Sequence, residues 1–289
     1  MPIKDSEIIL NPDGSVYHLN LRPEHIAKPI ITVGDPDRVD NVTKHFDSVD
    51  FKTSKREFHT QTGTYKGKPI TVISTGIGTD NIDIVFNELD ALVNIDLETR
   101  TIKNKLMSLD IIRIGTSGSI QEAIPIDSFL ISEYAVGFDS LLHFYDSKTI
   151  LHKDISNALM SHTQWNTAKS HPYVVSCDSR LSKKLSSDIT FKGFTATNVG
   201  FYGPQGRILR LAIEDEQLND KLASFDYNDH SITNLEMETA GIYGLSKLLG
   251  HNAISMNAII ANRATGEFST KPQKVIDDLI VYTLEKLTS

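Results

Sequence analysis

Short apolar runs alternate with longer amphipathic stretches along most of the chain. The runs 30–33, 70–74 and 111–114 are rich in β-branched residues, which is typical of buried strands. Segments 79–93 and 274–287 repeat apolar positions with helical spacing and are predicted to be helices. Strands that alternate with helices indicate an α/β fold with a central mixed β-sheet flanked by α-helices.

The same reasoning extends to the rest of the chain. Further strands are expected at 127–133, 173–176, 194–199 and 253–261, and further helices at 39–46, 150–162 and 234–249. We expect 94–108 to form a polar surface extension. Gly115–Gly118 should be a turn that ends the strand before it, because glycines punctuate regular structure.

Composition narrows the class of protein. A chain of 289 residues with 39% hydrophobic and 23% charged residues fits a globular protein, and no linker or repeat divides it, so residues 1–289 are expected to form a single domain. The net charge of −8 argues against a nucleic-acid or membrane partner. Cys177 is the only cysteine, and no stretch has the length of a signal peptide core or a membrane span. These features predict a cytoplasmic protein.

A charged residue interrupts one of the buried runs. Arg113 lies between Ile112 and Ile114, where a charge is costly unless it is paired. The hydroxyls of Thr116 and Ser117 follow at once, so a guanidinium and a hydroxyl-rich turn could hold an oxyanion there. A structural Arg113 in a salt bridge beside an ordinary turn explains these residues equally well.

Two other glycine-containing segments carry candidate chemistry. Gly34–Arg38 follows a strand and precedes a helix, so its amides and Arg38 could face an anion, although Asp35 or Asp37 could simply cap the helix. Gly200–Arg207 combines glycines with two aromatic residues, an amide and a guanidinium, which favours a ligand-binding loop. Thr75–Asn81 imitates a dinucleotide fingerprint, but Asn81 stands at the third glycine position.

Read together, these segments resemble the nucleoside phosphorylase-I family, and within it the uridine phosphorylases. The resemblance runs from about His18 to the last helix. It rests on motifs that match in order: Gly34–Arg38, Arg56–Phe58, Ser74–Gly78, Arg113–Gly118, Phe201–Arg207 and Glu236–Glu238. It implies a barrel-like mixed sheet surrounded by helices. It also implies reversible phosphorolysis of uridine to uracil and ribose 1-phosphate in pyrimidine salvage.

The resemblance also implies roles for individual residues. Phosphate would be bound by Gly34, Arg38, Arg113 and Thr116, together with Arg56 from the neighbouring subunit. Ribose would contact His18 of the neighbouring subunit, Met237 and Glu238, and the base would contact Phe201, Gln205, Arg207 and Ile260, with Arg263 ordering the base-binding loop. Arg113, Gln205 and Arg207 would be the catalytic residues, the latter two by stabilising charge on the departing uracil.

The same resemblance bears on cofactors and assembly. Inorganic phosphate would be a co-substrate, and no other cofactor is implied. Many bacterial members bind a monovalent cation through residues that match Glu57 and Asn81, but Asn81 replaces a serine and Thr79-Asp80 replaces a Gly-Pro pair, which argues against potassium here. The expected assembly is a homo-oligomer, either a dimer or a hexamer built as a trimer of dimers.

Three other functions remain open at this point. A purine nucleoside phosphorylase or nucleosidase of the same fold would typically place an aspartate where this chain has Asn262-Arg263. A non-catalytic nucleoside-binding or storage protein would need no phosphate arginines. A dinucleotide-dependent oxidoreductase would need a complete glycine fingerprint.

Overall fold

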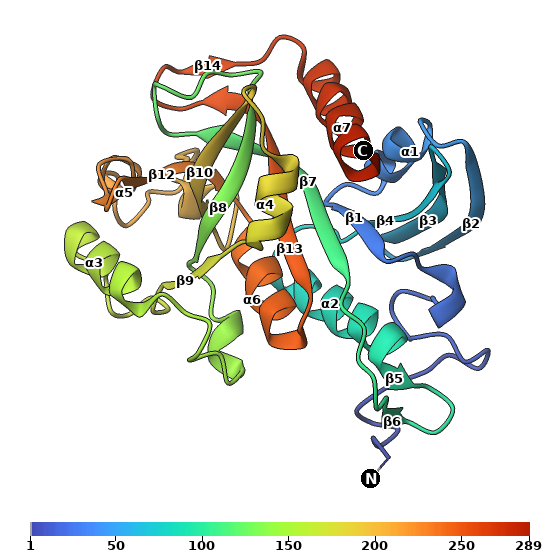
Figure 1. Ribbon diagram of the computed structural model, residues 1–289. Coiled ribbons are helices and arrows are strands. Elements are labelled where there is room, and N and C mark those ends of the chain that lie inside the picture. The colour runs from blue at the N-terminus through green and yellow to red at the C-terminus, as the bar shows by residue number, and fades with distance from the viewer. Residues whose placement is uncertain (1) are drawn as a thin grey trace.

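The computed structural model describes residues 2–289, and one large mixed β-sheet organises it (Figure 1). Its strands are β1 (Pro29–Val33), β2 (Ser48–Lys55), β3 (Phe58–Tyr65), β4 (Lys68–Ser74), β7 (Asp110–Ser119), β8 (Phe129–Gly137), β9 (Tyr173–Ser176), β10 (Thr190–Thr197), β11 (Asp226–Tyr227), β12 (His230–Glu236), β13 (Asn252–Asn262) and β14 (Glu267–Phe268). They follow the order β11-β12-β10-β8-β13-β7-β1-β4-β3-β2, with β9 paired to β8 and β14 paired to β13.

One end of this sheet closes on itself. β12 pairs antiparallel with β7, through Asn234 opposite Ser119 and Leu235 opposite Gly118. Since β7 also pairs with β13, and β13 with β8, the strands β7, β13, β8, β10 and β12 form a closed ring. Closure removes the exposed edges of these strands, and it confirms the expected barrel-like mixed sheet.

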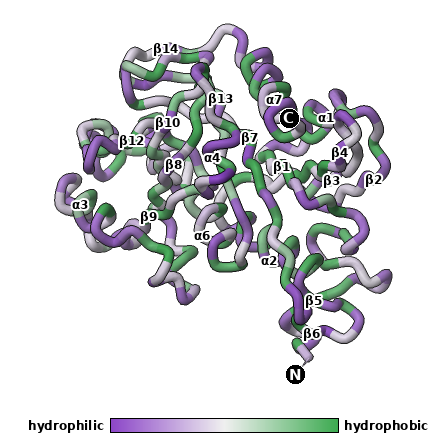
Figure 2. The backbone as a smooth tube through the Cα atoms, in the orientation of Figure 1, coloured by the Kyte–Doolittle hydropathy of each residue, from purple (hydrophilic) through white to green (hydrophobic). Residues whose placement is uncertain are grey.

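Helices cover the sheet and the ring. They are α1 (Asp37–Thr43), α2 (Thr79–Asn94), α3 (Lys153–Thr163), α4 (Ser179–Leu185), α5 (Leu218–Ala223), α6 (Thr239–Leu249) and α7 (Pro272–Thr288), with short 3₁₀ turns η1 (Pro23–His25), η2 (Leu141–Phe144) and η3 (Gly203–Gln205). α2 packs on α6 in one apolar cluster, whereas α1, α4 and α7 contribute to a second cluster. Figure 2 shows green strand segments at the centre of the molecule, where the sheet lies between these clusters.

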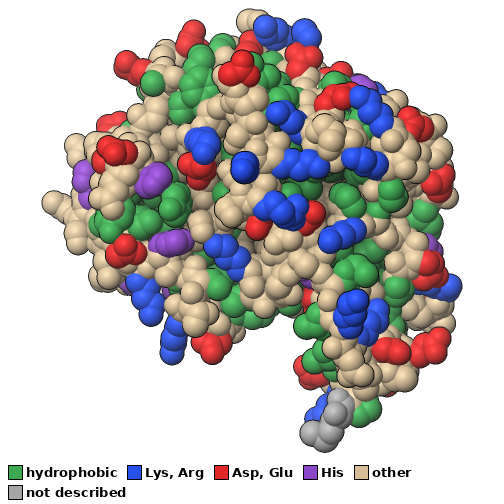
Figure 3. Space-filling model, viewed as in Figure 1, with side chains coloured by type: hydrophobic (Ala, Val, Ile, Leu, Met, Phe, Trp, Pro, Cys, Tyr) green, Lys and Arg blue, Asp and Glu red, His purple; other side chains and the backbone are tan. Residues whose placement is uncertain are grey.

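The segment expected to be a surface extension forms a small projection. It contains the hairpin of β5 (Ile95–Asp96) and β6 (Thr101–Ile102), which lies beside the N-terminal segment (Figure 1). The Arg100 guanidinium donates a hydrogen bond to the carbonyl of Ile8 at 2.6 Å, which ties the two together. On the face shown in Figure 3, lysine and arginine side chains are interspersed with acidic and apolar ones. Among residues 2–289, no helix combines the length and apolarity that a membrane crossing needs.

The structure corrects two local predictions. Gly115–Gly118 is not a turn, because β7 continues to Ser119 with β13 paired alongside it. Asn234 does not begin a helix either, since it lies within β12 and α6 begins at Thr239. Both segments pair with distant strands, and a sequence read locally does not reveal that pairing.

Candidate active site

A cavity of about 680 Å³ opens where several parallel strands end. Gly34 follows β1, Gly76 follows β4, Thr116 lies near the end of β7, and Ile260 lies near the end of β13. β1, β4, β7 and β13 run parallel, so their carboxyl ends meet at one side of the sheet. This is the usual place for ligands in open α/β sheets.

Arg113 is the buried charge of this cavity. Its guanidinium lies 2.7 Å from a Glu238 oxygen and 3.2 Å from a Glu236 oxygen. Burial alone would lower the pKa of Arg113, but the two carboxylates outweigh it and raise that pKa, so Arg113 stays charged. The position also explains Gly115, because a Cβ there would lie 1.9 Å from the Arg113 Nη1.

The two glutamates have different surroundings. Glu236 accepts hydrogen bonds from the backbone amides of Glu238 and Thr239, so it satisfies amides at the start of α6. Glu238 accepts from the backbone amide of Gly78 at 2.9 Å and from Arg113. Burial raises the pKa of Glu238, the charge of Arg113 opposes that rise, and the net direction is upward. Glu238 retains lone pairs that could accept hydrogen bonds from a ligand.

Arg38 provides a second guanidinium without a carboxylate partner. Its Nη1 donates to the carbonyl of Ile114 at 3.4 Å, and it forms no ion pair among residues 2–289. Burial lowers the pKa of Arg38, and the nearby charge of Arg113 lowers it further. Two guanidinium groups that repel each other beside a cavity are suited to an anion placed between them.

The loop that carries Gln205 also lines this cavity. The Gln205 Oε1 accepts a hydrogen bond from the Arg207 Nη1 at 2.7 Å, whereas its Nε2 makes no hydrogen bond within residues 2–289. The Arg207 guanidinium lies 3.8 Å from the centre of the Phe201 ring. The cavity therefore presents an aromatic face, a free amide donor and a guanidinium on one wall.

A buried chain of hydrogen bonds runs beneath the cavity floor. Asn257 accepts from the Arg113 Nη1 at 3.1 Å and donates to the Ser132 Oγ at 3.0 Å. Ser132 contacts Thr195, which donates to Asn234, and Asn234 donates to the Ser117 Oγ at 2.9 Å. This series of hydrogen bonds begins and ends at residues that line the cavity, and it crosses all five strands of the closed ring. Sequence reasoning missed Asn257 and Thr195, because single polar residues within strands carry no motif.

Known proteins resemble this chain in fold and sequence. The model of the phosphorylase superfamily matches residues 28–280. The chain belongs to this superfamily. A uridine phosphorylase of Thermococcus kodakarensis is 29% identical over 271 residues, which are 91% of this chain and 83% of that protein. A DeoD-type purine nucleoside phosphorylase of Listeria welshimeri is 26% identical over 271 residues, covering 93% of this chain and 97% of that protein.

A solved structure agrees with this assignment. A Trypanosoma brucei nucleoside phosphorylase, described as showing uridine phosphorylase activity, superposes with a TM-score of 0.88 at 29% identity, covering 97% of this chain and 99% of that one. The expected membership of the phosphorylase family is thereby confirmed, and so is the expected fold.

Most of the residues singled out for this phosphorylase lie together. The cavity is lined by Gly34, Arg38, Glu57, Asn81, Arg113, Thr116, Phe201, Gln205, Arg207, Met237, Glu238 and Ile260. Arg263 does not line it, but donates from its Nη1 to the carbonyl of Gln205 and from its Nη2 to that of Gly206 at 3.3 Å. Leu235, Glu236 and Phe268 also line the cavity, and no role was expected for them. The functional roles of all these residues stay predictions.

His18 and Arg56 lie outside this cavity. His18 Nδ1 is 2.7 Å from a Glu88 oxygen on α2, and the Arg56 guanidinium lies 5.9 Å from the centre of the Tyr17 ring. Arg56 occupies the turn between β2 and β3 with a φ of 56°. The expected role of these two residues in a neighbouring subunit's site stays a prediction.

Glu57 and Asn81 converge beside Gly76. A Cβ on Gly76 would lie 2.5 Å from the Asn81 Nδ2 and 3.1 Å from the Glu57 Cγ. The Asn81 Nδ2 donates to the carbonyl of Ile77 at 3.4 Å. Residues 2–289 offer no group of three histidine, cysteine or acidic side chains that could hold a metal ion. The expectation that Glu57 and Asn81 do not hold potassium stays a prediction.

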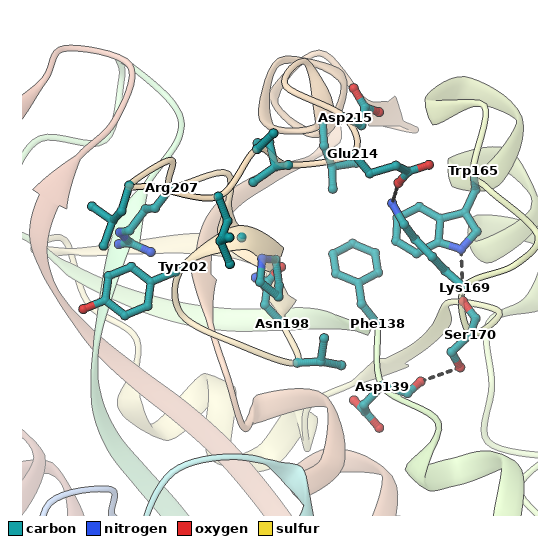
Figure 4. A pocket seen from close by; sticks show the side chains of 18 of the residues that line it. Phe138, Asp139, Trp165, Lys169, Ser170, Asn198, Tyr202, Arg207, Glu214 and Asp215 are labelled. Carbon is teal, nitrogen blue, oxygen red and sulfur yellow. Dashed lines mark hydrogen bonds and ion pairs between the residues drawn. The ribbon is translucent and has the colours of Figure 1, made fainter.

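A second cavity of about 890 Å³ adjoins the loop that carries Gln205 (Figure 4). Phe138 and Trp165 stack in its wall, with ring centres 4.8 Å apart. Lys169 and Glu214 form an ion pair at this cavity, as the close-up shows. Arg207 lines both cavities, so this loop separates them.

Proposed function

We propose that this phosphorylase is a uridine phosphorylase that cleaves uridine reversibly to uracil and ribose 1-phosphate. The observation that carries the proposal is the pairing of two features in one cavity. A half-buried Arg38 without a carboxylate partner lies near Arg113, and the wall formed by Phe201, Gln205 and Arg207 offers polar groups suited to a pyrimidine edge. A protein that only stored nucleosides would have no use for the first feature.

The proposed reaction assigns each group a distinct task. Arg38, Arg113, Thr116 and the backbone at Gly34 hold the phosphate, and guanidinium groups suit it because they pair bidentately with its oxygens. Glu238 accepts hydrogen bonds from ribose hydroxyls, and Met237 packs against the ribose. Phosphate attacks the anomeric carbon while the glycosidic bond breaks, and its negative charge stabilises the positive charge that develops on the ribose. Positioning supplies much of the rate, and no covalent intermediate with the protein is needed.

Base recognition follows from hydrogen-bond chemistry. Uracil has carbonyl oxygens at C2 and C4 and an N–H at N3, so an amide and a guanidinium can satisfy its edge. Arg207 donates to Gln205 Oε1, which orients the amide and leaves its Nε2 for a carbonyl. Both side chains also stabilise the negative charge that develops on uracil as it leaves. Ile260 lies where room for a C5 methyl would decide whether thymidine is used.

Purine cleavage is disfavoured by the end of β13. An acid that protonates the departing purine would contribute about 10²–10⁴ in rate, but this chain has Asn262-Arg263 at that place, and neither side chain is a carboxylic acid. Asn262 is fully engaged: its Nδ2 donates to the carbonyls of Gln121 and Ile124, and its Oδ1 accepts from the amides of Ala264 and Thr265. The amide thus has a structural task and offers no proton.

The remaining proposals concern the assembly and its surroundings. We propose that residues 1–289 act as a single domain in a cytoplasmic homo-oligomer, a dimer at least, in which Arg56 and His18 complete the site of a neighbour. Inorganic phosphate is the proposed co-substrate, with no organic cofactor. Nucleoside and phosphate are the proposed small-molecule partners.

A panel of nucleosides tests the assignment of the base. Wild type, Gln205→Ala and Arg207→Ala are assayed with uridine, cytidine, thymidine and inosine at saturating phosphate. Cytosine presents an amino donor at C4 and an acceptor at N3, and each unsatisfied buried group costs about 1–3 kcal/mol, so uridine should be preferred by roughly tenfold to a hundredfold. Both variants should lose that preference. Inosine turnover equal to that of uridine, or unchanged kinetics in both variants, would refute the assignment.

A further inference from the structure

We infer that Asn219, on α5, is a positioning residue that fixes the base-binding loop and thereby sets the affinity for the pyrimidine. The inference deepens the proposed function and rests on it. Its starting point is Gln205, whose side chain is only 3% exposed although it ends a single 3₁₀ turn within a long loop. Something outside this turn must hold it in place.

Two side chains from distant segments meet at the Gln205 carbonyl. The Asn219 Nδ2 donates to it at 3.0 Å, and the Arg263 Nη1 donates to the same oxygen. Arg263 comes from the end of β13, whereas Asn219 comes from the first turn of α5. A carbonyl oxygen has two lone pairs, so these donors occupy both and hold the Gln205 backbone from two directions.

The Asn219 amide also fits against the next residue. A Cβ on Gly206 would lie 2.4 Å from the Asn219 Nδ2, and Gly206 has a φ of 70°. Glycine is therefore required at 206 both by its backbone conformation and by the side chain packed against it. Asn219 and Gly206 form one contact that fixes the loop between Gln205 and Arg207.

The oxygen of the Asn219 amide, Oδ1, is buried and has no hydrogen-bond partner among the described residues. A leucine or alanine at 219 would avoid the free-energy cost of an unpaired buried acceptor. Turning the amide over would place an oxygen against the Gln205 carbonyl, so the observed orientation is the one that keeps the donor.

The chain between the loop and α5 offers little alternative support. Residues 208–214 form no backbone–backbone hydrogen bond with the rest of the described chain, and Ile208, Leu209 and Leu211 are exposed. Arg207 keeps its orientation through its own hydrogen bonds to the Phe201 carbonyl and Gln205 Oε1, and this part of the loop is in turn held by Asn219 and Arg263. Loss of the Asn219 contact should let the Gln205 and Arg207 side chains move away from the base.

The test compares Asn219→Ala and Asn219→Asp with wild type. Asp keeps the shape of the side chain but replaces the donor by an acceptor, which faces the Gln205 carbonyl. The loss of one hydrogen bond predicts a KM for uridine raised about three- to tenfold in Asn219→Ala, with a KM for phosphate changed less than twofold. Asn219→Asp should raise the uridine KM at least as much. The preference for uridine over cytidine should fall in both variants.

Asn166→Ala is the matched control, because the Asn166 Nδ2 donates to the Glu214 Oε1 at 2.7 Å near the same loop without contacting Gln205. It should leave both KM values unchanged. Hydrogen exchange of peptides covering 203–207 provides a readout without turnover and should be faster only in the Asn219 variants.

Three outcomes are separable. Unchanged uridine KM and unchanged exchange in the Asn219 variants would overturn the positioning role. A lower melting temperature with uridine and phosphate KM values that rise together would mean that Asn219 is merely structural, which also overturns it. A wild-type enzyme that does not cleave uridine would instead contradict the proposed function itself.

Discussion

At the scale of single residues, the site depends on how buried charges are paired. Arg113 is neutralised by Glu236 and Glu238, so it is held in place even without a ligand. Arg38 has no such partner. The two arginines therefore differ: the first organises the site, and the second is available to an incoming anion.

Arg38→Ala should accordingly weaken phosphate binding without unfolding the protein. Hydrogen bonds to charged groups contribute about 1.5–3 kcal/mol, so the KM for phosphate should rise roughly tenfold to a hundredfold. The KM for uridine should change little. Steady-state kinetics with each substrate varied in turn provides the measurement, and Arg22→Ala, whose guanidinium pairs with Asp13, is the control. Equal effects on both substrates would contradict the assignment of Arg38 to phosphate.

The buried Glu238 carboxylate should make the free energy of unfolding depend on pH. Its pKa in the folded protein is raised above the ordinary value of 4.5 by burial. At pH values between 4.5 and the raised pKa of the folded protein, the folded state binds more protons than the unfolded state. This group therefore makes the free energy of unfolding fall as pH rises through that range. Chemical denaturation of wild type and Glu238→Gln between pH 4 and 7 measures it. The free energy of unfolding of wild type relative to Glu238→Gln should rise toward acid pH, and a relative value that falls toward acid pH would reverse the assigned direction.

At the scale of elements, the sequence revealed helices and strands more readily than the contacts between them. The apolar runs at β1, β4 and β13 and the periodicity of α2 and α7 predicted those elements close to their observed bounds. The prediction of a turn at Gly115 followed from the usual preference of glycine for turns, and it was wrong. Here glycine is required by the Arg113 side chain that lies over it. The site motifs were visible because they are contiguous, but Asn219 and Asn257 act through partners far away in sequence.

The hydrogen-bond chain beneath the cavity leads to a prediction about the closed ring. Asn257→Leu removes the acceptor of Arg113 Nη1 and the donor to Ser132 Oγ, which leaves buried polar groups without those partners. Each such group costs about 1–3 kcal/mol, so the free energy of unfolding should fall by at least this amount. Asn252→Ala, on the same strand but bonded to Ser108 and Asp110, is the control. Equal losses in the free energy of unfolding of the two variants would show that this series of hydrogen bonds has no special importance for the stability of the closed ring.

At the scale of the whole molecule, the site of one chain is incomplete if Arg56 and His18 serve a neighbour. Both lie outside the chain's own cavity. The apolar side chain of Phe144, which is 82% exposed, would suit contact with a second copy.

Complementation tests this composite site. Arg56→Ala and Arg113→Ala should each be inactive as homo-oligomers. After mixed unfolding and reassembly, a dimer with one copy of each variant has one site free of both substitutions, so part of the activity should return. The same procedure on each variant alone is the control. Full activity in a chain shown to be monomeric would exclude the composite site.

The central claim is that phosphate, and not water, cleaves uridine in this cavity. The most direct measurement follows uracil release from uridine with and without inorganic phosphate, while phosphorus NMR identifies the sugar product. Uracil should appear only with phosphate, in amounts equal to a new sugar 1-phosphate resonance. Arg113→Ala should abolish both signals while its circular dichroism spectrum stays unchanged. Uracil released equally fast without phosphate, with free ribose as the product, would show that water and not phosphate cleaves uridine.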